Sequence, residues 1–133
     1  MATASDYAMT ALCLWREARG EGHAAMVSVA CVLRNRVQRR GTSFYAEVVR
    51  PWQFSSISAK GDPQLTNYPA PADPFWQMAQ DVARAVIDGQ AQDATQGSTL
   101  YYDDSISFPA TWNRAKVIPT VKIGRLNFFR ETT

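Results

Sequence analysis

A charged turn at residues 17–21 holds the side chains of this chain that are best placed to do chemistry. It has the sequence Glu-Ala-Arg-Gly-Glu, and Glu17 falls where an apolar helical pattern ends. A carboxyl group at the end of a buried helix can be desolvated on one side and face a cleft on the other, and desolvation makes it keep its proton longer. Leu14, Trp15 and Ala18 could form the apolar wall. Such an acid suits cleavage of an acetal bond between two sugars, because the poor leaving oxygen has to be protonated.

The same residues also fit a purely structural role. Gly20 or Gly22 would end the first helix, and charged residues between two helices often form a solvated turn. His23, the only histidine, stands at the start of the next helical pattern, where we expect a solvated side chain rather than a catalytic base. One histidine and two cysteines are too few for the usual structural zinc site, so no metal and no cofactor are expected.

Two helical patterns hold the charged turn between them. The first begins near Ser5 or Asp6, either of which could cap it, and ends near Arg19 or Gly20. The second, longer pattern starts after Gly22, and we expect it to be a core helix. The apolar residues of the first pattern are Ala8, Ala11, Leu12, Leu14 and Trp15, and those of the second are Met26, Val29, Ala30, Leu33 and Val37.

Two more helices are expected before residue 90. A short one covers residues 44–49, with Thr42 or Ser43 as its cap. Asp73 and Pro74 then form a strong start for a structural helix, which Gly89 ends. The apolar face of this helix comprises Phe75, Ala79, Val82, Ala83 and Val86.

An irregular loop is expected over residues 52–72, and loops of this length are more often functional than idle. Its most informative part is Trp52-Gln53-Phe54-Ser55. Gln53 and Ser55 can hydrogen-bond to sugar hydroxyls and N-acetyl groups, while Trp52 and Phe54 offer flat apolar faces. The two rings could instead pin the loop to the core.

The last third of the chain changes to β-branched and aromatic residues in short runs. These runs predict strands of a small antiparallel sheet. Pro119 suggests an edge strand or a break. The expected strands cover residues 99–102, 117–118, 120–123 and 127–129, with a turn at 124–125.

Composition indicates one ordinary globular domain, residues 1–133. Hydrophobic residues make up 46% and charged residues 20%, and no apolar run reaches the roughly 18 residues of a membrane span. The first six residues lack the basic start and apolar stretch of a secretory signal, so we expect the protein to be made in the cytoplasm. Cys13 and Cys31, each among apolar neighbours, are then expected to be buried free thiols.

The net charge of +2 is too small to indicate a nucleic-acid partner. Four arginines nevertheless cluster at the end of the second helix, where cations complement the helix dipole. A small helical nucleic-acid binder is the alternative interpretation of this cluster, which comprises Arg34, Arg36, Arg39 and Arg40.

Three motifs resemble the spore-cortex-lytic (SleB/CwlJ-type) cell wall hydrolase family. The Glu-Ala-Arg-Gly-Glu turn is followed by a helix that contains Asn35-Arg36-Val37, as at the opening of the family, and its Gln-Phe-Ser segment stands at residues 53–55. The resemblance continues to the end of the chain. The late aromatic pattern of the family matches at Tyr101, Tyr102, Pro109, Trp112, Ile123, Gly124, Phe128 and Phe129.

The resemblance implies an α+β fold, a mainly helical domain like those of lysozymes and lytic transglycosylases with a small antiparallel sheet in the C-terminal third. It implies a monomeric glycosidase that degrades peptidoglycan at the β-1,4 bond from N-acetylmuramic acid to N-acetylglucosamine, with Glu17 as the catalytic acid. Arg19 would pair with Glu21 or hold the cleft wall, and Asn35 would hydrogen-bond to the Glu17 turn. Substrate binding is expected at Gln53, Phe54, Ser55, Tyr101, Tyr102 and Trp112.

Two outcomes of the reaction stay open. In a lytic transglycosylase Glu17 acts first as acid and then as base, and 1,6-anhydromuramic ends form; a hydrolytic muramidase usually needs two carboxylates roughly 5 to 9.5 Å apart. Glu21 is the only second carboxylate nearby in sequence, and Gly20 argues against a shared helix face, which favours the transglycosylase. A catalytically silent glycan-binding module would keep the aromatic residues without needing Glu17.

The chain departs from the family at Leu126, where a histidine is common. This departure puts in doubt, for this chain, any mechanism that depends on that imidazole. A compact catalytic domain without an export signal would suit a bacteriophage endolysin, which reaches the cell wall after the membrane is permeabilised.

Overall fold

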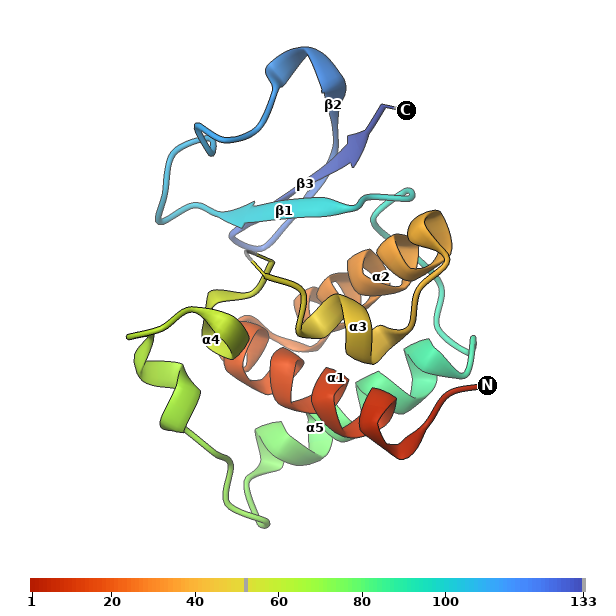
Figure 1. Ribbon diagram of the computed structural model, residues 1–133, viewed down its shortest axis with the longest axis vertical. Helices are drawn as coiled ribbons and strands as arrows, with labels where there is room; N and C mark the ends of the chain where they lie inside the picture. Colours follow the sequence, from red (N-terminus) through yellow and green to blue (C-terminus); the bar gives the residue numbers. More distant parts are fainter. Residues whose placement is uncertain (52, 133) are drawn as a thin grey trace.

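The computed structural model describes residues 1–51 and 53–132 and places a small antiparallel sheet against one end of a helical layer (Figure 1). The predicted α+β class is confirmed. Among the described residues, none of the helices is both long enough and apolar enough to cross a bilayer. The elements are α1 (Ala4–Ala18), α2 (His23–Arg40), α3 (Phe44–Val48), α4 (Ser55–Ser58), η1 (Pro63–Thr66), α5 (Pro74–Ile87), β1 (Leu100–Asp103), η2 (Arg114–Lys116), β2 (Val117–Ile123) and β3 (Leu126–Glu131).

The N-terminus of α1 differs from the prediction, because the cap is Thr3 and not Ser5 or Asp6. The Thr3 hydroxyl accepts from the Asp6 N–H at 3.3 Å, and the Asp6 carboxylate accepts from the Thr3 N–H at 2.8 Å. This reciprocal pair is a capping box. The second Asp6 oxygen accepts from the Tyr45 N–H at 2.8 Å, so the same carboxylate also joins α1 to α3.

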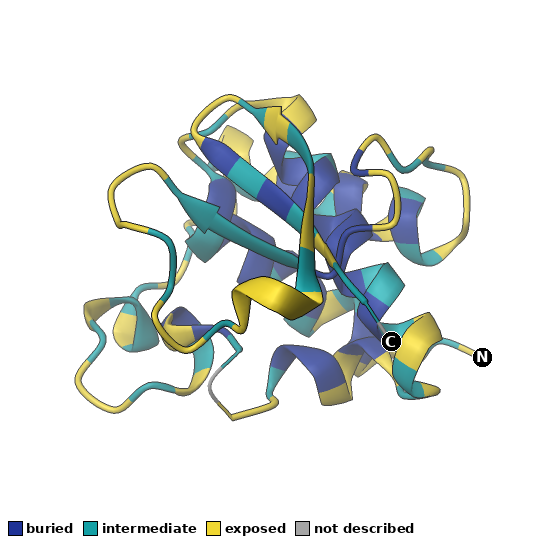
Figure 2. Ribbon diagram, turned by 90° about the horizontal axis from the view of Figure 1, so that it is seen from above, coloured by how far each residue is buried: buried dark blue, intermediate teal, exposed yellow. Residues whose placement is uncertain are grey.

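Helix α2 is a core helix, as its pattern predicted, and α1 and α5 pack against it. Buried residues gather where these helices meet (Figure 2). Two predicted core residues are exposed instead, since Ala8 and Phe75 lie on the outer faces of α1 and α5. Cys13 and Cys31 are buried free thiols, as expected. The buried apolar residues of α2 are Ala25, Met26, Val29, Ala30, Cys31, Val32 and Leu33.

The irregular loop predicted over residues 52–72 contains two short helical turns, α4 and η1. Arg16 on α1 fixes them. Its guanidinium donates to the Ser56 carbonyl at 2.9 Å and to the Asn67 carbonyl at 3.1 Å, and it lies 4.9 Å from the centre of the Tyr68 ring. These turns are held by tertiary contacts and therefore show no helical period in the sequence.

The sheet has the strand order β1-β3-β2, so β2 is an edge strand. Pro119 lies on this edge, which confirms the edge-strand alternative given for the proline. The strands expected at residues 117–118 and 120–123 are instead one strand, β2, whose pairing with β3 is irregular between Pro119 and Lys122. Gly124 has a φ of 57° in the predicted turn, a conformation that glycine adopts without strain. Tyr101 packs against Phe128, which is buried toward the helices, while Tyr102 stacks on Phe129.

Candidate active site

Three elements converge on Glu17, which is half-buried at the C-terminal end of α1. Its Oε2 accepts a hydrogen bond from the Ser56 hydroxyl at 2.6 Å, and its Oε1 accepts one from the Tyr101 hydroxyl at 3.0 Å. Ser56 comes from α4 and Tyr101 from β1. Both oxygens of one carboxylate are thus oriented by side chains that lie 39 and 84 residues away along the chain.

Both partners of Glu17 are hydroxyl groups. Burial raises the pKa of Tyr101 well above its ordinary value, and the negative charge of Glu17 adds to the shift, so Tyr101 keeps its proton at neutral pH. A hydroxyl can donate to an ionised carboxylate and accept from a protonated one. The Ser56 and Tyr101 contacts can therefore persist in either protonation state of Glu17.

Glu17 opens onto a cleft of about 410 Å³ between the helical layer and the sheet. The cleft brings together Glu17, Gln53, Tyr101, Tyr102 and Trp112, five residues that the sequence placed at a common site. They come from α1, from the loop before α4, from β1 and from the segment that joins β1 to β2. Among the described residues, no group of three side chains is arranged to hold a metal ion.

Two residues of the Gln-Phe-Ser segment do not face this cleft. Phe54 is only 2% exposed and belongs to the core, where its ring centre lies 5.3 Å from the Arg36 guanidinium. Ser55 is exposed and lines a different hollow together with Lys60. The serine that reaches Glu17 is its neighbour Ser56. Trp52, which was expected to offer an apolar face, lies outside the described residues.

The three predicted supporting residues have other contacts. Arg19 stacks on the Trp15 ring at 4.0 Å and donates to the Gln64 side chain at 3.3 Å, so it holds η1 against α1 rather than pairing with Glu21. Asn35 donates to Asp93 and to the Ser98 carbonyl, each at 2.9 Å, and thus anchors the loop before β1 rather than the Glu17 turn.

Glu21 does not line the Glu17 cleft. Helix α1 ends at Ala18, so Glu21 follows a turn and does not continue the helix. This agrees with the argument from Gly20 that the two glutamates share no helix face.

Three residues of the site were missed by the sequence analysis. Ser56 could have been considered because it follows directly in the same segment. Arg36 lines the cleft and is 5% exposed, with its Nε donating to the Thr99 carbonyl at 2.7 Å. Asp103, two residues after Tyr101 on β1, also lines the cleft. The alternation of side chains along a strand places Tyr101 and Asp103 on one face.

Asp103 is held as a carboxylate. A hydrogen bond from the Ser105 N–H lowers its pKa below the ordinary value against the effect of desolvation, and Arg125 at 3.2 Å adds to the lowering. Leu126 pairs with Asp103 across the sheet and lines the same cleft, 3% exposed. At the position where the family commonly has a histidine, this chain therefore has an apolar side chain, Leu126, beside the carboxylate of Asp103.

The four arginines of α2 do not form one basic surface. Arg34 donates to the Ala91 carbonyl, and Arg36 donates to the Thr99 carbonyl. Arg39 lies 3.8 Å from Glu131, and Arg40 lies 2.6 Å from the fully buried Glu47. Each guanidinium serves a separate contact, so the cluster gives no support to a nucleic-acid interface.

Comparisons with known proteins show a shared fold and a family. The catalytic domain of the germination-specific lytic transglycosylase SleB from Bacillus anthracis is 23% identical, with a TM-score of 0.73 over 96% of this chain and 95% of that chain. The catalytic domain of the Bacillus cereus SleB protein is 22% identical, with a TM-score of 0.71 over 96% of this chain and 91% of that chain. No curated protein sequence gives a significant match. A sequence model described as cell wall hydrolase matches residues 20–129. Because that match covers most of the chain, the protein belongs to the SleB/CwlJ-type cell wall hydrolase family.

Proposed function

We propose that this protein degrades peptidoglycan as a lytic transglycosylase, cleaving the β-1,4 bond between N-acetylmuramic acid and N-acetylglucosamine. The observation that carries the proposal is a single glutamate, Glu17, held by two hydroxyl groups and open to a cleft. The family and the fold shared with SleB catalytic domains support the substrate class. We propose further that residues 1–133 act as one monomeric catalytic domain.

In the first step Glu17 donates its proton to the glycosidic oxygen, and the bond from that oxygen to the muramic C1 breaks. N-acetylglucosamine leaves with the proton, and positive charge develops at C1 and the ring oxygen. In the second step the Glu17 carboxylate takes the proton of the muramic C6 hydroxyl while the C6 oxygen bonds to C1. The product is a 1,6-anhydromuramic end, and Glu17 is protonated again.

The hydroxyl partners of Glu17 fit this cycle. Ser56 and Tyr101 can donate while Glu17 is a carboxylate and accept while it is an acid. An arginine or a backbone N–H can only donate, and would favour the carboxylate throughout. Side chains that work in both states suit a group that must be acid and base in turn.

The other residues of the cleft would bind the sugars. Gln53 offers an amide to the N-acetyl groups, and Tyr102 and Trp112 offer ring faces on which a pyranose can lie. Trp112 is held edge-on against Tyr102 at 5.8 Å between ring centres, so its orientation is fixed before substrate arrives. A fixed aromatic face lowers the entropy cost of binding.

Hydrolysis by a muramidase is the second candidate function, and Asp103 is the observation in its favour. Inverting and retaining glycosidases pair a protonated acid with an ionised carboxylate. Asp103 lines the cleft with Glu17 and is kept ionised by its neighbours. In this route Asp103, rather than Glu21, would activate water or stabilise the charge at C1.

Mass spectrometry of the soluble products from peptidoglycan sacculi tests the proposal. Muropeptides with 1,6-anhydromuramic ends are expected, whereas reducing muramic ends would establish hydrolysis. Glu17→Gln should abolish cleavage and retain binding to sacculi; unchanged cleavage would refute the role of Glu17. Asp103→Asn should still form anhydro ends, and its inactivity with retained fold would favour the muramidase. A wild-type protein that binds sacculi and releases nothing would instead be a glycan-binding module.

A further inference from the structure

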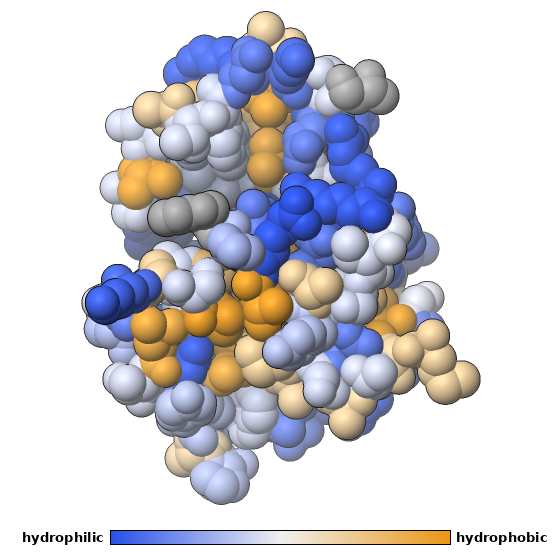
Figure 3. Space-filling model, in the orientation of Figure 1, coloured by the Kyte–Doolittle hydropathy of each residue, from blue (hydrophilic) through white to orange (hydrophobic). Residues whose placement is uncertain are grey.

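A second hollow, of about 760 Å³, adjoins the Glu17 cleft. The two share Gln53, Leu100 and Trp112 in their walls, so they form one trough that passes Trp112. From there the trough runs between the C-terminal end of α2 and the segment that contains η2. Figure 3 shows a band of hydrophilic residues where α2 meets the sheet.

The second hollow is lined by charged, amide and hydroxyl groups around an apolar strip. Thr111, Asn113 and Thr132 supply polar groups to its lining, while Trp112 and Val117 supply apolar ones. Amide and hydroxyl groups of this kind can donate to and accept from peptide groups. A lining that combines polar and apolar groups in this way suits a short peptide that has both polar backbone groups and apolar side chains.

Most charges of the second hollow are already compensated. Arg40 is 2.6 Å from Glu47, which is fully buried. Glu131 accepts from the Thr99 hydroxyl at 2.8 Å and lies 3.8 Å from Arg39. These pairs leave little charge for a ligand to meet.

Lys116 is the charge of the second hollow that pairs with no other described residue. Within residues 1–51 and 53–132 its ammonium group has no carboxylate within ion-pair distance. Its backbone is nevertheless fixed, because the Lys116 carbonyl accepts from the Thr132 N–H at 2.9 Å and from the Thr132 hydroxyl at 3.2 Å. The Lys116 ammonium group thus extends from a hydrogen-bonded backbone and lies beside amide and hydroxyl groups that can bind peptide groups. This arrangement points to an anionic ligand.

We infer that the second hollow binds the peptide stem of the muramic acid residue, with Lys116 on a stem carboxylate. This rests on the proposed function. While the stem is attached, the lactyl carboxyl of muramic acid is held in an amide bond and the glycan carries no charge, so a cation without a partner among the described residues meets no anionic group on the glycan itself, whereas the stem carries free carboxylates. The stem leaves the strand from the muramic sugar, which is the sugar at the scissile bond. The trough past Trp112 thus joins the site of bond cleavage to a site for the stem.

The test compares two substrates made from sacculi that carry no secondary anionic polymer. One keeps its stems, and the other has been stripped by an N-acetylmuramoyl-L-alanine amidase and then had its freed lactyl carboxylates capped as neutral methylamides. Lys116→Gln should lower the cleavage rate on stem-bearing sacculi by about two- to fivefold, the effect of one solvent-exposed ion pair, and leave the rate on stripped glycan unchanged. Added salt should reduce the wild-type preference for stems, because the contact is partly exposed.

Lys122→Gln is the matched control, since Lys122 is exposed, pairs with Asp104 and lines neither hollow. If Lys116→Gln slows cleavage of both substrates equally, the second hollow binds glycan and not the stem. If it slows cleavage of neither substrate, the inference is refuted. If the wild type cleaves neither substrate, the proposed function fails on its own. Sedimentation with the two kinds of sacculi then decides the inference: Glu17→Gln must prefer stem-bearing sacculi, and the Lys116→Gln double variant must lose that preference.

Discussion

Tyr101→Phe isolates the contribution of one hydroxyl to the acid. The substitution removes the 3.0 Å hydrogen bond to Glu17 Oε1 and keeps the ring in its place against Phe128. A hydrogen bond to a charged group contributes about 1.5 to 3 kcal/mol, and each 1.36 kcal/mol of barrier is about tenfold in rate. Water from the cleft can occupy part of the vacated position. We therefore expect the lower part of the range, a loss of about tenfold in kcat.

The assay is the initial rate of muropeptide release at saturating peptidoglycan, with thermal unfolding measured in parallel. Tyr45→Phe is the control, because Tyr45 is 44% exposed on α3 and the same atom is removed far from the cleft. The control should keep both its rate and its Tm. A wild-type kcat in Tyr101→Phe, with an unchanged Tm, would refute the claim that this hydroxyl serves Glu17.

Ser56→Ala extends the same experiment to the other oxygen. The Ser56 bond is 2.6 Å long and the residue is 3% exposed, so less water can replace the hydroxyl and the loss should exceed that of Tyr101→Phe. Because both hydroxyls hold one carboxylate, their effects should not add in the double variant. Strict additivity would mean that the two groups act on the reaction separately.

Three further predictions concern the scaffold. Glu47→Ala should lower the free energy of unfolding by about 3 kcal/mol, since it removes the buried partner of Arg40; denaturant unfolding would measure it, and a change below about 1 kcal/mol would contradict it. Burial of Asp93 opposes ionisation, but hydrogen bonds from Thr95 and Asn35 outweigh it and lower the pKa below 3.8. The stability that Asp93 contributes is therefore complete above pH 3.8 and is lost as the pH falls through the lowered pKa. Asp93→Asn should flatten the dependence of Tm on pH in that acid range, and an unchanged profile would show that Asp93 is not its source. Burial raises the pKa of the Cys13 thiol well above its usual value, so a thiol reagent should label Cys13 only after unfolding, and rapid labelling of the native protein would contradict its burial.

Helices that carry their own signals were predicted correctly from the sequence. Asp73 caps α5 with Pro74 in the first turn, and the stop at Gly89 was also correct. The start of α1 was misplaced because Thr3, Ser5 and Asp6 are all good caps, and only the reciprocal bonds of the folded chain select Thr3. The sequence is therefore sufficient to place the start of a helix where only one residue is a good cap.

The site was predictable as a set of segments but not residue by residue. Glu17, Gln53 and the late aromatic residues do meet at one cleft. Which of two adjacent serines faces Glu17 depends on the rotation of α4, and that rotation is set by Arg16 from another element. Arg36 was grouped with its neighbours as a helix-end cation, although successive residues of a helix point about 100° apart. In both cases, the serine that faces Glu17 and the direction of the Arg36 side chain, the outcome depends on contacts between segments that are distant in the sequence.

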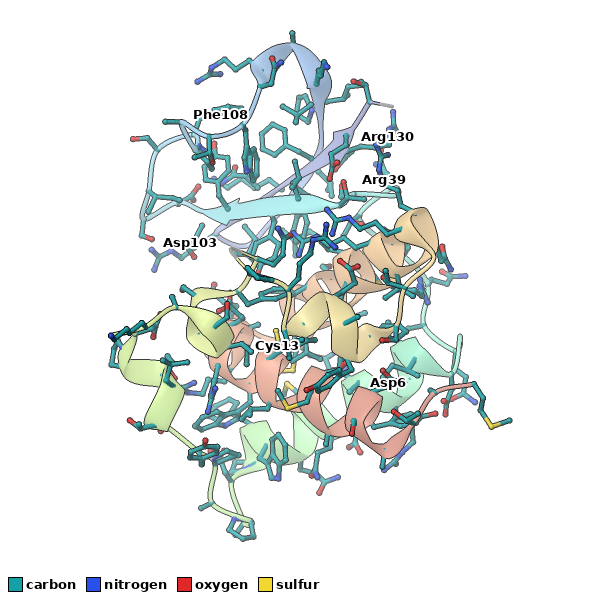
Figure 4. The ribbon with its side chains drawn as sticks, in the orientation of Figure 1. Asp6, Cys13, Arg39, Asp103, Phe108 and Arg130 are labelled. Carbon is teal, nitrogen blue, oxygen red and sulfur yellow. The ribbon has the colours of Figure 1, made fainter. Side chains whose placement is uncertain are left out.

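The segment between β1 and β2 rests on an aromatic cluster of Tyr102, Phe108, Trp112 and Phe129, with ring centres 5.4 to 6.1 Å apart. Phe108 lies in this segment, apart from the helices (Figure 4). The four rings lie outside the helical core. One wall of the cleft therefore rests on this aromatic cluster, while Glu17 on the other side lies on α1, which belongs to the helical core. Because the two are separate hydrophobic units, the smaller aromatic cluster can unfold locally while the helical core stays folded. On heating, affinity for the glycan should disappear before helical content does, and amide exchange should be faster at residues 104–116 than in α2.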